Sequence, residues 1–280
     1  MTLRLDHIVH AVHDPHQAAK TFAERLLVPT STGGRHEAWG TYNTLAPLAA
    51  AYLEWASVFD AGLAADNEFG RWLLYDLERG EGVSQLAVTA KDLDAVADRW
   101  RRAGLPFIGP VPGRRVRPDG SMLSWRLLFP ARESGEAFPL PFLIEWDEGQ
   151  APVATPMSAR DVAPLHLVNL HAWVHSPDHT YTRMAAYYDG LWTPPVWMEH
   201  KGVRVLVWDL GAAKLWLWPE GTSAVKAEVP RVLERGERVV AADFVRSAEQ
   251  REWDGQSLFH GQPCLHGLYV SVLQPQEGKS

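Results

Sequence analysis

A strand–helix–strands pattern occurs twice in the first half of the chain, at residues 5–54 and 84–145. Each copy begins with a short apolar strand that carries one side chain able to bind a metal, His7 in the first copy and Gln85 in the second. Seven residues later an aspartate begins a helix, and each copy ends on a strand that closes with Glu-Trp, at Glu54 and Glu145. A repeat of this kind predicts two copies of one supersecondary unit packed together. Their four polar side chains would then form one site.

Both helices carry start signals. Asp14 is a capping residue followed by a proline at the first helical position, and Asp92 caps the second helix, which Gly104 ends. We expect strands at 4–13, 51–58, 85–90, 121–129 and 142–146, an extended stretch from Gly33-Gly34 to residue 48, and a helix or loop at 60–79.

The second half of the chain contains weaker copies of the same pattern. Residues 168–177 can be laid over residues 6–15, which puts Asn169 at the position of His7. Strand 214–218 resembles the Glu-Trp strands, but Leu217 replaces the glutamate. Strands at 239–245 and 265–273 would form a fourth, more divergent copy. With the Ala- and Pro-rich segment 149–164 as linker, we expect one domain at 1–150, built from two modules, and an additional degenerate domain at 160–280.

Composition excludes several classes of protein. Acidic residues outnumber basic ones, 34 to 27, which argues against nucleic-acid binding. The single cysteine, Cys264, cannot form an internal disulfide, which fits a reducing compartment. No apolar run approaches the ~20 residues that span a bilayer, and the N-terminus lacks the layout of a signal peptide. We therefore expect a cytoplasmic protein without nucleic-acid or membrane partners.

The four repeated polar residues suggest a metal site. An imidazole (His7), an amide (Gln85) and two carboxylates (Glu54, Glu145) suit nickel, cobalt, zinc, manganese or iron, whereas a structural zinc site would use several cysteines. A glutamate buried between apolar neighbours on a strand needs a partner, which can be a cation, an arginine or water. With a cation bound, the open positions take water or substrate oxygens and a glutamate can act as base.

Five segments carry a resemblance to a known family: residues 5–9, 33–43, 52–54, 125–130 and 141–146. They are similar to the vicinal oxygen chelate superfamily, in particular its glyoxalase-like branch. The resemblance implies an α+β fold of repeated βαβββ modules, which form half-open mixed β-sheet barrels with flanking helices around a divalent metal. Glyoxalase I enzymes use a His/Gln and Glu pair from each module, which matches His7, Glu54, Gln85 and Glu145.

The first functional hypothesis is a metal-dependent lyase or isomerase of the glyoxalase type that acts on a small oxygenated metabolite. Glu54 or Glu145 would be the catalytic base, and Arg126 would orient the substrate. Arg126 could instead form an ion pair with Glu145. Arg35, which follows a Gly-Gly turn, is predicted to contact the substrate at the cavity mouth.

Two further predicted substrate contacts are His36, beside that turn, and Asn43, on a predicted strand. The alternative function is a metal-free protein that binds or sequesters a small molecule, as in the bleomycin-resistance members of the superfamily. An extradiol-type dioxygenase would need two histidines and one glutamate on iron, and Gln85 argues against it. The sequence leaves a homodimer open.

Overall fold

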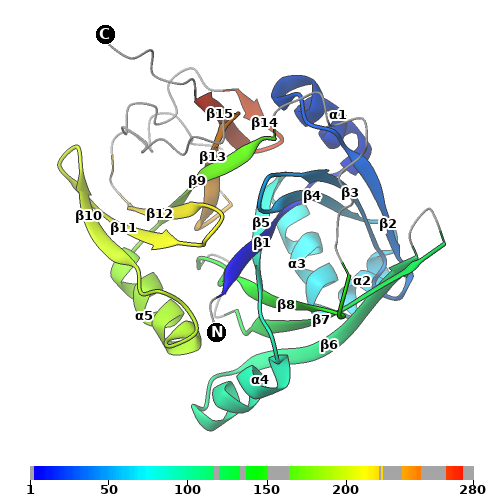
Figure 1. Ribbon diagram of the computed structural model, residues 1–280, viewed down its shortest axis with the longest axis horizontal. Helices are drawn as coiled ribbons and strands as arrows, with labels where there is room; N and C mark the ends of the chain where they lie inside the picture. The colour runs from blue at the N-terminus through cyan, green and yellow to red at the C-terminus, as the bar shows by residue number, and fades with distance from the viewer. Residues whose placement is uncertain are drawn as a thin grey trace.

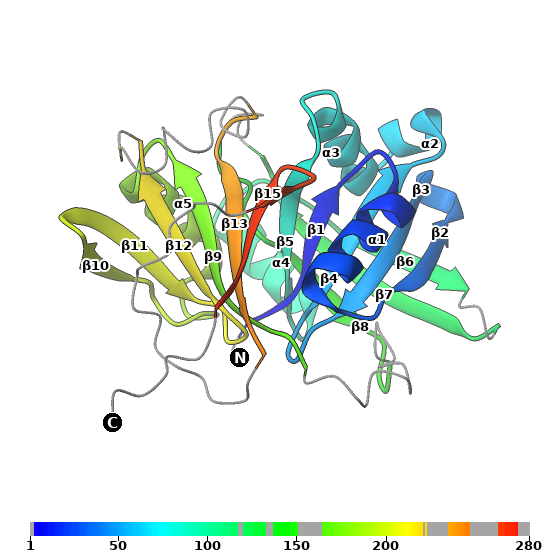
Figure 2. The same ribbon diagram turned by 90° about the horizontal axis from the view of Figure 1, so that it is seen from above.

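Two curved β-sheets lie side by side in the computed structural model (Figure 1, Figure 2). The structure describes residues 3–116, 120–132, 137–150, 164–220, 222, 235–246 and 263–273. Within these ranges no helix is long and apolar enough to cross a membrane. The predicted α+β class with half-open barrels is confirmed.

The first sheet has eight strands in the order β2-β3-β4-β1-β5-β8-β7-β6. The strands are β1 (Arg4–Ala11), β2 (Ser31–His36), β3 (Thr41–Pro47), β4 (Tyr52–Val58), β5 (Gly82–Thr89), β6 (Phe107–Val116), β7 (Met122–Pro130) and β8 (Phe142–Trp146). At its centre β1 and β5 pair antiparallel, and each pairs in parallel with the last strand of its own module, β4 or β8. The sheet curls around its concave side, as Figure 1 shows.

The second sheet has seven strands in the order β10-β11-β12-β9-β13-β15-β14. They are β9 (His166–Val174), β10 (Val196–His200), β11 (Val203–Asp209), β12 (Lys214–Pro219), β13 (Arg238–Val245), β14 (Cys264–Leu265) and β15 (Leu268–Leu273). Here β9 and β13 take the central places that β1 and β5 hold in the first sheet. The predicted linker at 149–164 lies almost entirely outside the described residues, so the domain boundary stays a prediction.

The helices begin where the sequence provides caps. They are α1 (Pro15–Leu26), the 3₁₀ turn η1 (Glu37–Trp39), α2 (Ala61–Ala65), α3 (Glu68–Leu77), α4 (Leu93–Arg102) and α5 (Pro177–Tyr188). Asp14 accepts hydrogen bonds from the backbone N–H groups of His16 and Gln17, which satisfies two donors that the first turn leaves unpaired. The segment 60–79 forms α2 and α3, and β6 is a strand that the sequence patterns did not predict.

The two sheets share one hydrophobic core that includes the inner faces of α1, α4 and α5. Trp100 of α4 is fully buried and its indole N–H donates to the carbonyl of Tyr187 in α5 at 2.8 Å. The hydroxyl of Tyr187 in turn donates to the carbonyl of Pro106 at 2.7 Å. Helices from both halves of the chain are therefore joined by apolar packing and by satisfied polar groups.

His10 forms a second connection between the sheets. It lies on β1, on the face opposite the concave side, and its Nε2–H donates to the carbonyl of His266 between β14 and β15 at 2.6 Å. Burial lowers the pKa of His10 to about 4. The charged groups that face it are Glu81, Arg235 and His266. The imidazole is therefore neutral in the folded protein, and the unfolded chain takes up a proton first as the pH falls.

We predict that stability decreases as the pH falls from about 6.5 towards 4, because over this range His10 is protonated only in the unfolded chain. His10→Gln keeps an N–H donor but cannot titrate, so the variant should lose less unfolding free energy across this window, by up to about 3 kcal/mol. Urea unfolding of both proteins at pH 7 and pH 4.5 measures the difference. Equal pH dependence in the two proteins would show that His10 is not the responsible group.

Candidate functional site

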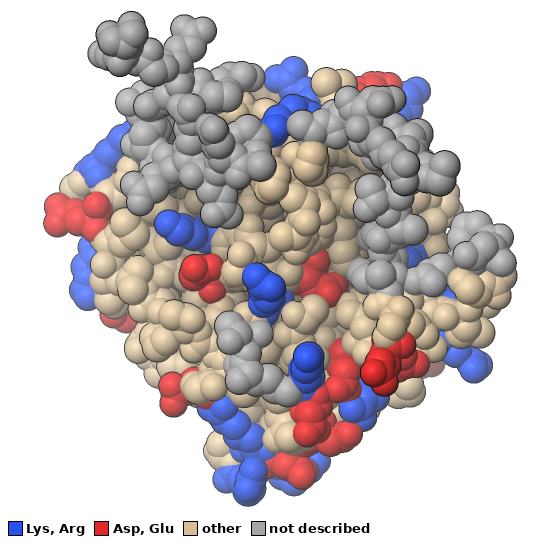
Figure 3. Space-filling view, viewed as in Figure 1, with Lys and Arg blue, Asp and Glu red and all other residues tan. Residues whose placement is uncertain are grey.

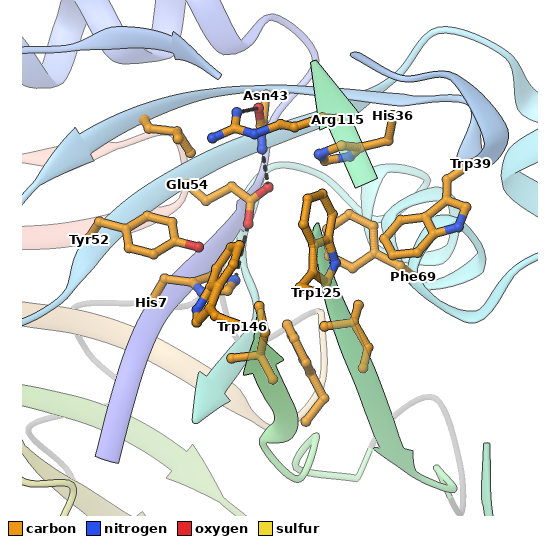
Figure 4. Close-up of a pocket in the computed structure, with 14 residues that line it drawn as sticks. His7, His36, Trp39, Asn43, Tyr52, Glu54, Phe69, Arg115, Trp125 and Trp146 are labelled. Carbon is orange, nitrogen blue, oxygen red and sulfur yellow. Dashed lines mark hydrogen bonds and ion pairs between the residues drawn. The ribbon is translucent and has the colours of Figure 1, made fainter. Parts of the chain in front are cut away.

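A narrow cavity of about 30 Å³ lies on the concave side of the first sheet (Figure 4). Strands β1, β3, β4, β6, β7 and β8 contribute to its wall, and α3 contributes Phe69. Its polar lining residues are His7, His36, Asn43, Glu54 and Arg115. Its aromatic and aliphatic lining residues are Trp39, Leu45, Tyr52, Phe69, Trp125, Leu127, Phe142, Ile144 and Trp146. An apolar lining with a few polar groups at one end is typical of a small-molecule site, and because a volume of about 30 Å³ holds about one water, a larger ligand requires lining side chains to move.

A β-bulge sets the geometry of the polar end. Along β1, Leu5 is opposite Val88 and His7 is opposite Ala87, so Asp6 is an extra residue without a cross-strand partner. A bulge interrupts the alternation of side chains along a strand. Asp6 can therefore reach the ring of the next residue, and its Oδ1 lies 2.7 Å from His7 Nδ1. Asp6 Oδ2 accepts the indole N–H of Trp146 at 3.0 Å, which holds the carboxylate in place.

A chain of contacts continues from His7 to β6. His7 Nε2 lies 3.2 Å from Glu54 Oε2, and Asn43 Nδ2 donates to Glu54 Oε1 at 2.5 Å. Arg115 Nη1 donates to Asn43 Oδ1 at 3.4 Å. Figure 4 shows these groups stacked along one side of the cavity, facing Trp125. The parallel pairing of β1 and β4, with Val9 opposite Glu54 and His7 opposite Tyr52, brings the imidazole and the carboxylate together.

Burial and pairing oppose each other in this network. Burial disfavours an imidazolium, but hydrogen bonds to Asp6 and Glu54 outweigh it and raise the pKa of His7 to about 9. Burial would raise the pKa of Glu54, but the contact with His7 lowers it to about 2. The polar end of the cavity is thus built to hold a positive charge between two carboxylates.

Gln85 faces the same side of the sheet. It lies opposite Val9 on the neighbouring strand β5, and directly opposite residues share a face. The side chain is 6% exposed, and its carbonyl oxygen is buried without a hydrogen-bond partner among the described residues. A buried acceptor without a partner costs about 1–3 kcal/mol, so it usually marks a place for water or a ligand.

The register of the strands shows which residues are equivalent in the two modules. The local twofold axis that exchanges β1 and β5 passes between Ile8 and Leu86 and exchanges Val9 with Ala87, each of which lies two residues after its module's polar residue, His7 or Gln85. The partner of Val9 on β4 is Glu54, and the partner of Ala87 on β8 is Phe142. Phe142 therefore occupies the second-module position of Glu54. Its ring packs edge-on against His7, 5.7 Å between centroids.

Glu145 does not reach the cavity, which corrects the expectation of a four-ligand site. Its neighbours Ile144 and Trp146 line the cavity, so strand alternation points Glu145 to the opposite face. There its Oε1 accepts the backbone N–H of Asp92, the capping residue of α4, at 2.6 Å. In Figure 3 acidic and basic side chains gather around this part of the surface, where α4 lies at the lower edge.

Arg126 is also outside the cavity. Its guanidinium forms ion pairs with Glu145 and, at 2.7 Å, with Asp94, and its side chain is 37% exposed. The predicted catalytic and substrate-binding roles of Arg126 are therefore not compatible with its position. The ion pair with Glu145, which was the alternative interpretation, is what the structure contains.

Of the three remaining predicted substrate contacts, two lie at the cavity and one lies outside it. His36 and Asn43 line the cavity. His36 Nδ1 lies 2.9 Å from the hydroxyl of Thr41, and burial lowers the pKa of His36 to about 4, so its ring is neutral. Arg35 points outward, where it pairs with Glu37 at 3.1 Å and stacks 3.6 Å above the ring of Phe59. Strand alternation on β2 separates it from His36.

Sequence reasoning missed Asp6 and Arg115, and it did not identify which aromatic residues form the wall of the cavity. Asp6 lies on the strand predicted at 4–13, but the alternation of side chains alone would have placed its carboxylate away from His7. No local sequence pattern indicates the bulge. Arg115 is 6% exposed on β6, a strand that the sequence patterns did not predict. The aromatic residues come from both modules and from α3, so only the folded chain brings them together.

The second sheet has its own polar group on the equivalent face. Asp243 Oδ2 accepts from Asn169 at 3.0 Å and lies 2.9 Å from His171 Nε2, and its Oδ1 accepts the hydroxyl of Ser271. The indole N–H of Trp216 donates to Asn169 at 2.9 Å. Asn169, which aligns with His7 in sequence, is thus engaged in an internal hydrogen-bond network. These contacts join asparagine, histidine, aspartate, serine and tryptophan side chains.

The comparisons with known proteins agree with this architecture. The model of the glyoxalase-like domain family matches residues 5–188, well over half of the chain. The chain therefore belongs to the glyoxalase-like domain family. Among curated proteins, none matches the chain.

Three solved structures illustrate the similarity. A hypothetical protein from Staphylococcus aureus is 13% identical with a TM-score of 0.69, covering 97% of this chain and 100% of that one. A mutant of 4-hydroxymandelate synthase from Streptomyces coelicolor is 14% identical with a TM-score of 0.51, covering 88% of this chain and 71% of that one. Methylmalonyl-CoA epimerase from Streptomyces coelicolor is 22% identical with a TM-score of 0.39, covering 51% of this chain and 97% of that one. At these identities the likeness shows the fold alone.

The buried contacts of Asp6 predict a large loss of stability when its carboxylate is removed. Asp6→Ala leaves His7 Nδ1 and the Trp146 indole without their acceptor, so we expect a loss of about 2–4 kcal/mol in unfolding free energy. Asp94→Ala, which removes an exposed carboxylate paired with Arg126, should change it by less than about 1 kcal/mol. Chemical denaturation measures both. Similar losses in the two variants would contradict the placement of Asp6 in a buried network.

Proposed function

We propose that the chain is a metal-dependent lyase or isomerase of the glyoxalase type, in which His7, Glu54 and Gln85 hold a divalent cation and the aromatic cavity receives a small oxygenated metabolite. The observation that carries the proposal is that three adjacent strands, β4, β1 and β5, each carry a buried donor on the same face of the sheet. His7 Nε2 and Glu54 Oε2 are 3.2 Å apart, and the oxygen of Gln85 is unpaired among the described residues.

The donor set fits a catalytic rather than a structural metal site. Three protein ligands with an open position are typical of catalytic centres. The Asp6–His7 hydrogen bond supports the assignment, since a metal-binding histidine usually donates its other ring N–H to a carboxylate. Among the described residues no group of three histidine, cysteine, aspartate or glutamate side chains has metal-site geometry, so the Gln85 amide is needed as the third donor.

The side chains around the donors suggest how a substrate would be handled. A divalent cation would supply Lewis-acid polarisation of a carbonyl or enediolate oxygen. Glu54 is the carboxylate that would act as base; because Asn43 binds Oε1, the accepting atom would be Oε2, which would have to leave the cation to take the proton. Flat rings such as Trp125 and Phe69 would orient an unsaturated or aromatic substrate and exclude water.

Metal analysis tests the proposal. Protein purified without added metal should contain divalent metal by elemental analysis, and titration of the metal-free protein with zinc, cobalt, nickel or manganese should show one site. Glu54→Gln and Gln85→Leu should weaken binding at least ~10-fold, because the first replaces a charged carboxylate ligand by a neutral amide and the second removes the amide donor. Glu145→Gln should bind metal like the unaltered protein.

Comparison of the Glu54→Gln and Glu145→Gln variants shows whether the cation lies in this cavity. Metal-free protein that binds none of these ions would overturn the proposed metal dependence. A loss of metal in Glu145→Gln but not in Glu54→Gln would show that the cation lies elsewhere than in this cavity.

A second candidate function is a metal-free binding protein. The observation in its favour is Phe142, which stands where the second module would supply another carboxylate, while the imidazolium of His7 already balances Glu54. In that case an aromatic acid should quench tryptophan fluorescence saturably, with equal affinity in the presence of a chelator and without turnover. The metal-dependent proposal expects the chelator to weaken binding.

A further inference from the structure

A buried charge cluster lies where α3 meets the second sheet. The carboxylate of Asp76, near the end of α3, is fully buried. Its Oδ1 is contacted by Arg238 Nη1 at 3.0 Å and by Arg235 Nη2 at 3.6 Å, and its Oδ2 accepts the hydroxyl of Ser84. Two guanidinium groups thus share a single carboxylate oxygen.

The two arginines keep buried N–H groups that these contacts do not use. Arg235 and Arg238 are 3% and 1% exposed. Arg235 Nε and Nη2 and Arg238 Nη2 have no hydrogen-bond partner among the described residues. Arg235 Nη1 donates to the carbonyl of Glu81 at 2.9 Å, which fixes the plane of the guanidinium. Buried charged donors are expensive to leave unpaired, so each such group calls for an acceptor.

The charge balance around the cluster points the same way. Burial and the neighbouring Arg238 lower the pKa of Arg235 to about 9. Burial also lowers the pKa of Arg238, against the opposing attraction of Asp76. Burial thus disfavours the charged form of both guanidinium groups, and an anion beside them would favour it.

The backbone makes room for this arrangement. A Cβ added to Gly82 would lie 1.8 Å from Arg235 Nη1, so a side chain at this position would displace the guanidinium. Gly82 has a φ of +151°, a conformation that other residues rarely adopt. The start of β5 therefore forms a cradle for the guanidinium of Arg235.

We propose that Arg235 and Arg238 bind a small oxyanion, phosphate or sulfate in chemistry, at the junction of α3 and the second sheet. The planar fork of an arginine presents paired N–H groups to the oxygens of such an anion. This site is separate from the proposed metal cavity, because Asp76 lies two turns along α3 from Phe69, the residue that this helix contributes to the cavity, and neither arginine lines the cavity. An anion would hold α3 against the second sheet and stabilise the wall of the cavity.

Anion titrations test the proposal on the full chain. Sodium phosphate and sodium sulfate should raise the melting temperature saturably at constant ionic strength, whereas chloride should not, and calorimetry should give one site per chain. Acetate as a third titrant distinguishes a tetrahedral oxyanion from any carboxylate. Arg235→Gln and Arg238→Gln should each weaken phosphate binding at least tenfold. Arg102→Gln, an exposed arginine on α4, should bind like the unaltered protein.

Phosphate and sulfate binding to the unaltered protein tests the proposal even if a variant does not fold. Absence of saturable phosphate and sulfate binding, or equal binding in Arg235→Gln and Arg102→Gln, would overturn the proposal. The conservative Arg235→Lys keeps the positive charge and loses the fork. It should bind phosphate more weakly than the unaltered protein; equal binding would contradict recognition by paired N–H groups.

Discussion

The arrangement of β1 between β4 and β5 is the constraint on which the site depends. Parallel pairing with β4 brings His7 close to Glu54, and antiparallel pairing with β5 places Gln85 opposite Val9 on the same face. A single bulge at Asp6 then gives the imidazole a second carboxylate. Since a shift of one residue in any of these pairings would turn a polar side chain to the other face, the register specifies the site as strictly as the residues themselves.

Much of the fold was predictable from the repeat in the sequence. The caps at Asp14 and Asp92, the strands β1, β4, β7 and β8 and the module order all follow from local patterns, and the structure has them, whereas β5 begins three residues before its predicted start. The positions of His36 and Asn43 at the cavity also agree with the sequence-based prediction.

The wrong placements of Glu145 and Arg126 have one physical origin. Matching the Glu-Trp pairs aligned Glu54 with Glu145, but the strand register aligns Glu54 with Phe142, three positions earlier. Residues an odd number of positions apart on a strand point to opposite faces of the sheet. Glu145 therefore lies on the outer face beside α4, where Arg126 forms an ion pair with it. The bulge at Asp6 and the contribution of Arg115 from β6 depend on contacts between distant segments, which no local pattern encodes.

These findings describe a cavity with His7 and Glu54 at its polar end and an aromatic wall. Its two modules are unequal, because the first supplies His7 and Glu54 while the second supplies Gln85 and an apolar ring in place of a carboxylate. The second sheet packs against the first through shared core and charged contacts, and its own polar face is closed by internal hydrogen bonds.

The most direct test of the central claim is an anomalous difference map from crystals grown with cobalt or zinc. The account predicts one strong peak in the cavity, about 2.0–2.2 Å from His7 Nε2 and from a carboxylate oxygen of Glu54, with Gln85 as the third protein ligand. A peak beside Glu145, or no peak in the cavity at full metal saturation in solution, would contradict it.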